Sequence, residues 1–191
     1  MSIAAPPPTS RTMTAEEIMA LPEDGVHREI IRGELREKPM TRRNRMHSCT
    51  EATIVWLLRT WLDGQPEPRG KVHCGEAGFR LRPDPETFVG IDVAYASAEL
   101  VASTAPELPF YDGPPVLAVE ILSPSDKHEE LVEKVRSYLG AGTVVWVVDP
   151  DFRTVSVHRP GCEVEGFNAS HEISGDPYLP GFRARVAEFF S

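Results

Sequence analysis

The segment from Val116 to Leu122 constrains the fold more than any other part of the sequence. Its side chains are apolar except for Glu120, and such a short apolar run predicts a central strand buried on both faces. A helical pattern follows from Ser123 to about Leu139, with a buried stripe at Leu131, Val135, Tyr138 and Leu139. Residues 143–148 form a second apolar strand. The order of strand, helix and strand predicts a right-handed parallel crossover.

The rest of the chain adds helices and strands around this crossover. We expect a capped helix at 13–19, a hairpin over 27–38 that turns at Arg32-Gly33, a long helix at 44–62, strands at 71–81, 89–96 and 154–158, a loop at 97–115 and a closing segment at 179–190, part of it helical. This order predicts an α/β fold, bordering on α+β, with a mixed sheet. The length predicts a single domain over 13–191, after a disordered, proline-rich tail at 1–12.

Composition and charge narrow the possible functions. No apolar stretch reaches the roughly 20 residues that span a bilayer, and the first residues do not resemble a signal peptide. The three cysteines are scattered, which predicts no disulfide scaffold and favours the cytoplasm. The net charge of −9 argues against general nucleic-acid affinity. A basic segment from Arg36 to Arg45, densest at Arg42, Arg43 and Arg45, can still contact phosphates, and the alternative is a solvated loop.

Two carboxylates in strand patterns suggest a metal site. Asp92 lies in the predicted strand 89–96 beside Gly90, and Glu120 lies near the end of the central strand. A buried carboxylate is costly unless it is paired or binds a metal, and hard oxygen ligands suit Mg²⁺ or Mn²⁺. Lys134 flanks the buried stripe of the following helix and can stabilise charge on a phosphate. Each residue also has a plain structural explanation: a strand-end aspartate, a paired core glutamate and a solvated lysine.

Several motifs together resemble a known family. They are Arg28–Leu35, His47, Ile91-Asp92-Val93, Leu117–Ser125, Lys134, Tyr138, Gly142 and Trp146–Pro150. Over roughly residues 14 to 190 the chain resembles the Uma-type (DUF820) restriction endonuclease family, which is similar to the PD-(D/E)XK nucleases. The family usually has Pro-Asp-Val where this chain has Ile91-Asp92-Val93.

The resemblance implies a restriction-endonuclease-like mixed sheet flanked by helices. It also implies a catalytic Asp92 and a catalytic Glu120. The motif lysine is absent, because Leu122 stands two residues after the glutamate, and the resemblance implies that Lys134 takes its place. Glu29 and His47 match family positions near the expected site. Alternatively, they are a strand-edge carboxylate and a surface histidine at a helix start.

Two functions compete at this point. The first is a Mg²⁺-dependent endonuclease that hydrolyses DNA phosphodiester bonds, with weak DNA affinity through Arg42, Arg43 and Arg45. The second is a non-catalytic binding or assembly module on a nuclease fold. A serine hydrolase is disfavoured because the chain has no Gly-x-Ser-x-Gly motif, and zinc because it has no Cys-x-x-Cys. We also expect a homodimer, with Phe182, Phe189 and Phe190 as candidate exposed contacts; the alternative is that these residues cap the core.

Overall fold

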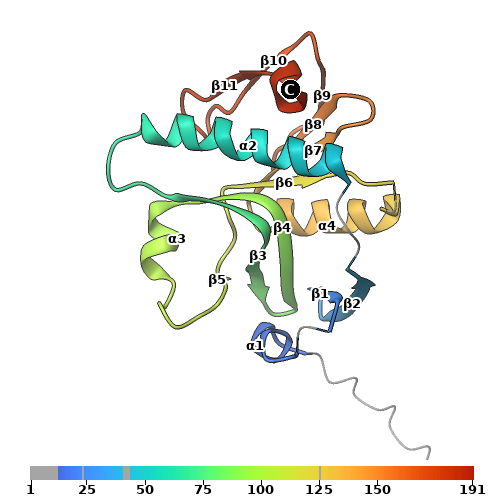
Figure 1. Ribbon diagram of the computed structural model, residues 1–191. Coiled ribbons are helices and arrows are strands. Elements are labelled where there is room, and N and C mark those ends of the chain that lie inside the picture. The colour runs from blue at the N-terminus through green and yellow to red at the C-terminus, as the bar shows by residue number, and fades with distance from the viewer. Residues whose placement is uncertain (1–12, 23, 41–43, 125) are drawn as a thin grey trace, which may run out of the picture.

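A mixed sheet with helices on both faces forms the centre of the molecule (Figure 1). The computed structural model describes residues 13–22, 24–40, 44–124 and 126–191. The helices are α1 (Ala15–Met19), α2 (Arg45–Asp63), α3 (Ala98–Ser103), α4 (His128–Gly140) and the 3-10 helix η1 (Val186–Phe190). The strands are β1 (Val26–Ile31), β2 (Glu34–Pro39), β3 (Lys71–Pro83), β4 (Glu86–Ala96), β5 (Tyr111–Asp112), β6 (Leu117–Ile121), β7 (Val144–Asp149), β8 (Thr154–His158), β9 (Glu165–Asn168), β10 (Glu172–Ser174) and β11 (Arg183–Arg185).

The predicted parallel crossover is the centre of this sheet. The main strand order is β2-β1-β4-β6-β7-β8-β9, in which β6 and β7 run parallel on either side of the α4 connection. Side chains alternate along β6: Leu117, Val119 and Ile121 pack with α2, whereas Ala118 packs with α4 residues. Glu120 therefore falls on the α4 face, although its neighbours in sequence belong to the other half of the core.

One edge of β4 is shared between two strands. Strand β1 pairs with it at Ile30–Phe88, and β6 pairs with it from Val93 to Tyr95. Between these pairings, backbone groups bond to side chains: the Gly90 N–H donates to Glu29 and the Ile121 N–H donates to Asp92. Polar side chains are thus required at this gap, because buried backbone groups need hydrogen-bond partners.

Local sequence signals account for the ends of several elements. Thr14 and Glu17 form a capping box at α1, and the Asn44 side chain caps α2. Arg32 and Gly33 both have positive φ, as a tight hairpin turn requires. The expectation of a continuous loop at 97–115 is wrong: Ser97 caps α3, and β5 follows, pairing with β3.

Other expectations need smaller corrections. Helix α4 begins at His128 rather than near Ser123, because the Ser123 N–H bonds to Asp126 in a turn before the helix. Strand β3 extends to Pro83, beyond the expected limit. Phe182 and Phe189 are not exposed dimer contacts, because both pack in the core with Trp146. No helix in the described part of the chain is long and apolar enough to cross a membrane.

Arg80 joins α1, β4 and β5 to β3, and we expect its loss to destabilise the fold. Its guanidinium pairs with Glu16, Glu86 and Asp112 and lies 5.0 Å from the Phe110 ring centroid. Arg80→Met should lower the free energy of unfolding by about 2–3 kcal/mol, because Glu86, whose side chain is only 10% exposed, loses its charged partner. Urea denaturation measures this. The matched control is Arg59→Met, which removes only an exposed pair with Asp63; an equal loss in both variants would contradict the assignment.

Candidate active site

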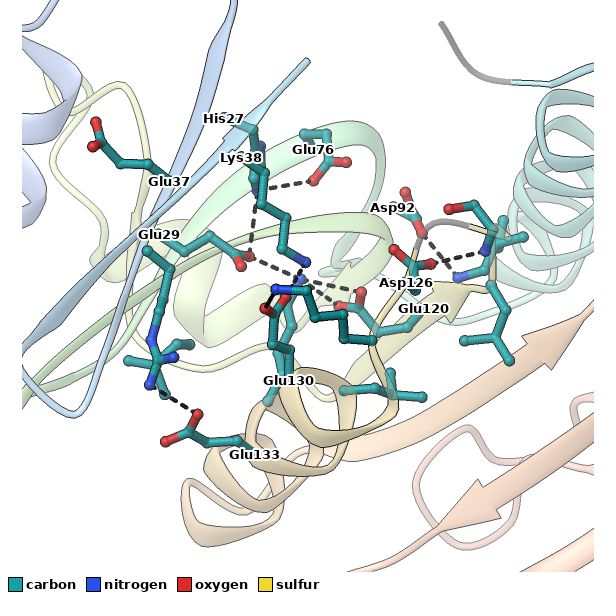
Figure 2. A pocket seen from close by; sticks show the side chains of 18 of the residues that line it. His27, Glu29, Glu37, Lys38, Glu76, Asp92, Glu120, Asp126, Glu130 and Glu133 are labelled. Carbon is teal, nitrogen blue, oxygen red and sulfur yellow. Dashed lines mark hydrogen bonds and ion pairs between the residues drawn. The ribbon is translucent and has the colours of Figure 1, made fainter. Parts of the chain in front are cut away.

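A cavity of about 540 Å³ opens beside the gap on β4. Its wall is formed by the β1–β2 hairpin, Glu76 of β3, Asp92 in the middle of β4, the end of β6, and α4. The residues that matter most are His27, Glu29, Glu76, Asp92, Glu120 and Lys134. In Figure 2, Glu29 and Glu120 point toward one another from opposite walls, and His27 and Glu76 lie above them. Four of the five residues expected at the site therefore line one cavity: Glu29, Asp92, Glu120 and Lys134.

Lys134 contacts both Glu29 and Glu120. Its ammonium lies 2.8 Å from a Glu29 oxygen, 3.1 Å from Glu120 and 2.8 Å from the Gly90 carbonyl oxygen. An ammonium has three N–H donors, so these contacts use them all. In this arrangement Lys134 holds two buried carboxylates in place, and contact with a substrate phosphate requires the exchange of one acceptor.

Glu120 is held by two residues of α4. Tyr138, fully buried, donates its hydroxyl to one Glu120 oxygen at 2.6 Å, and Lys134 contacts the same carboxylate. The two residues are four apart on the helix, so they share a face. We did not predict a contact of Tyr138 with the site. The sequence did contain a signal for this contact: Tyr138 lies on the buried stripe of a helix, and a buried tyrosine hydroxyl needs a hydrogen-bond partner.

Asp92 is positioned from two sides. One of its oxygens accepts the Ile121 N–H at 2.8 Å, and the other lies 3.3 Å from Nε2 of His47. His47 is completely buried in the first turn of α2, so the alternative of a surface histidine is wrong. Its Nδ1 lies 3.7 Å from Glu51, which in turn accepts the Gly75 N–H. His47 thus contacts Asp92 but does not line the cavity.

Gly90 leaves room for protein side chains. A Cβ built at this position would lie 2.8 Å from a Glu76 oxygen and 2.9 Å from the His27 ring. Glu76 reaches this place from a bulge in β3 between Cys74 and Ala77, where Gly75 and Glu76 both have positive φ. The space left by the missing side chain of Gly90 is therefore occupied by His27 and Glu76.

Burial and neighbouring charges shift the pKa values of the two carboxylates next to Lys134, Glu29 and Glu120, in opposite directions. Burial alone would raise the pKa of Glu29, but Lys134 and His27 outweigh it and lower that pKa to about 2. For Glu120, burial dominates and, helped by Asp92 and Glu29, raises its pKa to about 7 despite Lys134. The same carboxylates hold the pKa of Lys134 well above its ordinary value, against the effect of burial. Lys134 is therefore charged and Glu29 ionised, and Glu120 is the carboxyl most ready to take up a proton.

The donor atoms of the cavity suit a hard divalent cation. Asp92 and Glu120 present carboxylate oxygens to one cavity from neighbouring strands, and Mg²⁺ commonly binds one or two carboxylates while keeping waters. Among the residues described, no group of three or more histidine, cysteine, aspartate or glutamate side chains is arranged around a metal position. A cation here would thus depend on these two carboxylates and on oxygens of water or substrate.

Two other basic residues, Lys127 and Arg45, are exposed. Lys127, directly before α4, also lines the cavity, but its side chain is 77% exposed and pairs with Glu130 at 2.9 Å. Arg45 begins α2 and is exposed. Arg42 and Arg43 lie outside the described residues, as does the predicted tail at 1–12. Contact with DNA through Arg42, Arg43 and Arg45 therefore remains a prediction.

We expect Glu29 to make stability pH-dependent in acid. Its folded pKa, about 2, lies below its ordinary value of 4.5, so the folded state binds fewer protons. Its contribution is then present above pH 4.5 and lost as the pH falls toward 2. Without metal, Glu29→Gln should be about 3 kcal/mol less stable than wild type at neutral pH, and the two should converge in acid. Denaturant unfolding across pH measures this; a difference that stays constant with pH would contradict it.

Comparisons with known proteins agree with this architecture. A crystal structure from Anabaena variabilis, described as a putative nuclease belonging to DUF820, matches with a TM-score of 0.77, covering 93% of this chain and 97% of that chain. Its sequence identity is 21%, so it shows the fold, which is restriction-endonuclease-like. The Uma2 family model, described as putative restriction endonuclease, matches residues 15–187. The chain belongs to this family. No protein among those with curated descriptions matches it.

Proposed function

We propose that the chain is a Mg²⁺- or Mn²⁺-dependent endonuclease that hydrolyses DNA phosphodiester bonds. One observation carries the proposal: two buried carboxylates on adjacent strands, Asp92 and Glu120, line one cavity with Lys134, whose side chain is 14% exposed. Burying such a cluster costs free energy that a purely structural module need not spend. Membership of a family described as restriction endonucleases agrees with a nuclease-like function.

The residues of the chain have distinct parts in this reaction. Asp92 and Glu120 would hold the cation, which when bound supplies an activated water and neutralises charge on the leaving oxygen. His47 and the Ile121 N–H fix Asp92, while Tyr138 and Lys134 fix Glu120. Lys134 also supplies a positive charge 3.1 Å from Glu120, and that charge favours the ionised, metal-binding form of this carboxylate.

A crystal soaked in Mn²⁺ tests this proposal. We expect anomalous density within ligand distance of both Asp92 and Glu120, and none there in crystals of Asp92→Asn. Density at another place in wild type, or none at all, would contradict the shared site.

A non-catalytic nucleic-acid-binding or assembly module is the second candidate. The observations that favour it are the net charge of −9 and the pairing of Arg36 and Lys38 with acidic residues at the cavity. For the nuclease, DNA is the expected partner, bound with low affinity through Arg42, Arg43 and Arg45; no DNA binding with or without metal would favour the non-catalytic module. The three cysteines are exposed and free, in keeping with a reducing cytoplasm.

We expect the protein to form a homodimer in solution. Enzymes that cut both strands of a duplex gain from a matching two-fold symmetry. Since Phe182 and Phe189 are buried, the contact must use other residues, and Trp56 on α2 is 63% exposed. Light scattering should give about twice the chain mass of 21.2 kDa. A mass equal to that of one chain would contradict the dimer.

A further inference from the structure

Two basic residues of the hairpin face the cavity. Arg36 lies directly opposite Glu29 in the β1–β2 register, and Lys38 lies opposite His27. Directly opposed residues of an antiparallel pair project from the same face, and all four side chains line the cavity. Arg36 and Lys38 are 36% and 46% exposed. They therefore mark the mouth of the cavity, whereas Glu29 and Lys134 lie deeper inside.

Helix α4 supplies a carboxylate for each of these cations. Arg36 lies 3.0 Å from Glu133, and Lys38 lies 2.8 Å from Glu130. The two glutamates are three residues apart, so they share a helix face. Figure 2 shows Glu130 and Glu133 on α4, below Lys38 of the hairpin. The hairpin and the helix are thus joined across the cavity mouth by two ion pairs.

Arg36 and Glu130 each have a second ion-pair partner. Arg36 also lies 2.9 Å from Glu34, and Glu130 lies 2.9 Å from Lys127. Hydrogen bonds from Lys38 and then Lys127 are the main causes that hold the pKa of Glu130 below its ordinary value. Glu130 is therefore an anion at neutral pH. Ion pairs as exposed as these contribute little to stability, so another anion can replace the carboxylates at small cost.

We propose that Arg36 and Lys38 form a phosphate-binding subsite for the nucleic-acid backbone, which Glu130 and Glu133 occupy until substrate replaces them. This inference rests on the proposed function and adds to it the place where the backbone enters. It differs from the predicted patch at Arg42, Arg43 and Arg45, which comes later in the sequence, where the chain leads into α2. A backbone phosphate seated at Arg36 and Lys38 leads inward along the hairpin face toward Glu29 and Lys134.

Binding of a short labelled duplex, with Ca²⁺ in place of Mg²⁺ to prevent cleavage, tests the subsite. The double variant Glu130→Gln, Glu133→Gln should bind roughly tenfold more tightly than wild type, because the competing anions are gone. The matched control is Glu129→Gln, Glu163→Gln, which changes the net charge equally at two exposed glutamates away from the cavity lining. This control should change affinity by less than about twofold.

Removing the cations should have the opposite effect. Arg36→Gln, Lys38→Gln should bind more weakly, and the slope of log affinity against log salt should become shallower by about two. Combining all four substitutions should abolish the gain from the glutamate pair, because that gain depends on the two cations. An equal gain in the control, a gain that survives in the fourfold variant, or no duplex binding by any variant would overturn the inference.

Cleavage assays separate this inference from the proposed function. If binding follows the expected pattern but Mg²⁺ and Mn²⁺ support no cleavage, the nuclease proposal fails and the subsite stands. If wild type cleaves DNA but the glutamate pair gives no gain in affinity, the subsite fails and the nuclease stands.

Discussion

Replacement of Lys134 by alanine is expected to abolish metal-dependent DNA cleavage, whereas replacement of Lys127 leaves most of it. The Lys134 ammonium lies within 3.1 Å of both Glu29 and Glu120. Without it, two buried carboxylates face each other with no positive charge between them, so Glu120 favours its protonated form and binds metal poorly. We expect a loss of roughly a hundredfold or more in cleavage rate, similar to the loss of a key electrostatic group elsewhere.

The controls for this prediction address folding. Removing one member of a buried ion cluster costs about 3–5 kcal/mol, so circular dichroism must show that the variant is folded under assay conditions. Lys134→Met keeps most of the side-chain volume and should lose cleavage to the same extent. Lys127→Met changes an exposed lysine and is the matched comparison. A larger loss in the Lys127 variant than in the Lys134 variants would refute the assignment.

Glu120→Gln is expected to weaken Mn²⁺ binding by at least about a hundredfold relative to wild type. The substitution keeps the shape of the side chain but removes the charge that a hard cation requires. Calorimetric titration measures the affinity. Glu76→Gln is the control, because Glu76 lines the same cavity but belongs to the β3 bulge. Equal Mn²⁺ affinity in wild type and Glu120→Gln would contradict a shared site.

The same titration tests the positioning of Glu120 by Tyr138. Tyr138→Phe removes only the hydroxyl that donates to Glu120 at 2.6 Å. Residues that orient a metal ligand typically contribute about tenfold to a hundredfold in metal affinity, so an intermediate loss is expected. Unchanged affinity would show that Lys134 alone is sufficient to hold the carboxylate.

The sequence predicted the parts of the fold that depend on local periodicity. The apolar run around Glu120, the stripe on α4 and the apolar β7 strand together predicted the parallel crossover, which the structure confirms. The hairpin at Arg32-Gly33 followed from turn chemistry. Helix α3 was missed because the prolines of 97–115 outweighed Ser97, a residue whose side chain caps helices.

The interior of the site was harder to predict because its contacts join distant segments. Nothing local to Glu29 shows that it faces Lys134, since that contact depends on where β1 leaves the edge of β4. The burial of His47 depends on Asp92, far away in sequence. The filling of the space at Gly90 depends on a bulge in β3, which a strand pattern does not reveal.

Plasmid nicking by wild type and Asp92→Asn tests the central claim most directly. Supercoiled DNA is incubated with each purified protein in Mg²⁺, in Mn²⁺ and in EDTA, and the conversion to nicked and linear forms is followed. The account predicts nicking by wild type only with a divalent metal, and its loss in Asp92→Asn, which keeps an oxygen for the Ile121 N–H. Equal nicking by both proteins, or nicking by wild type in EDTA, would contradict a metal-dependent site at Asp92 and Glu120.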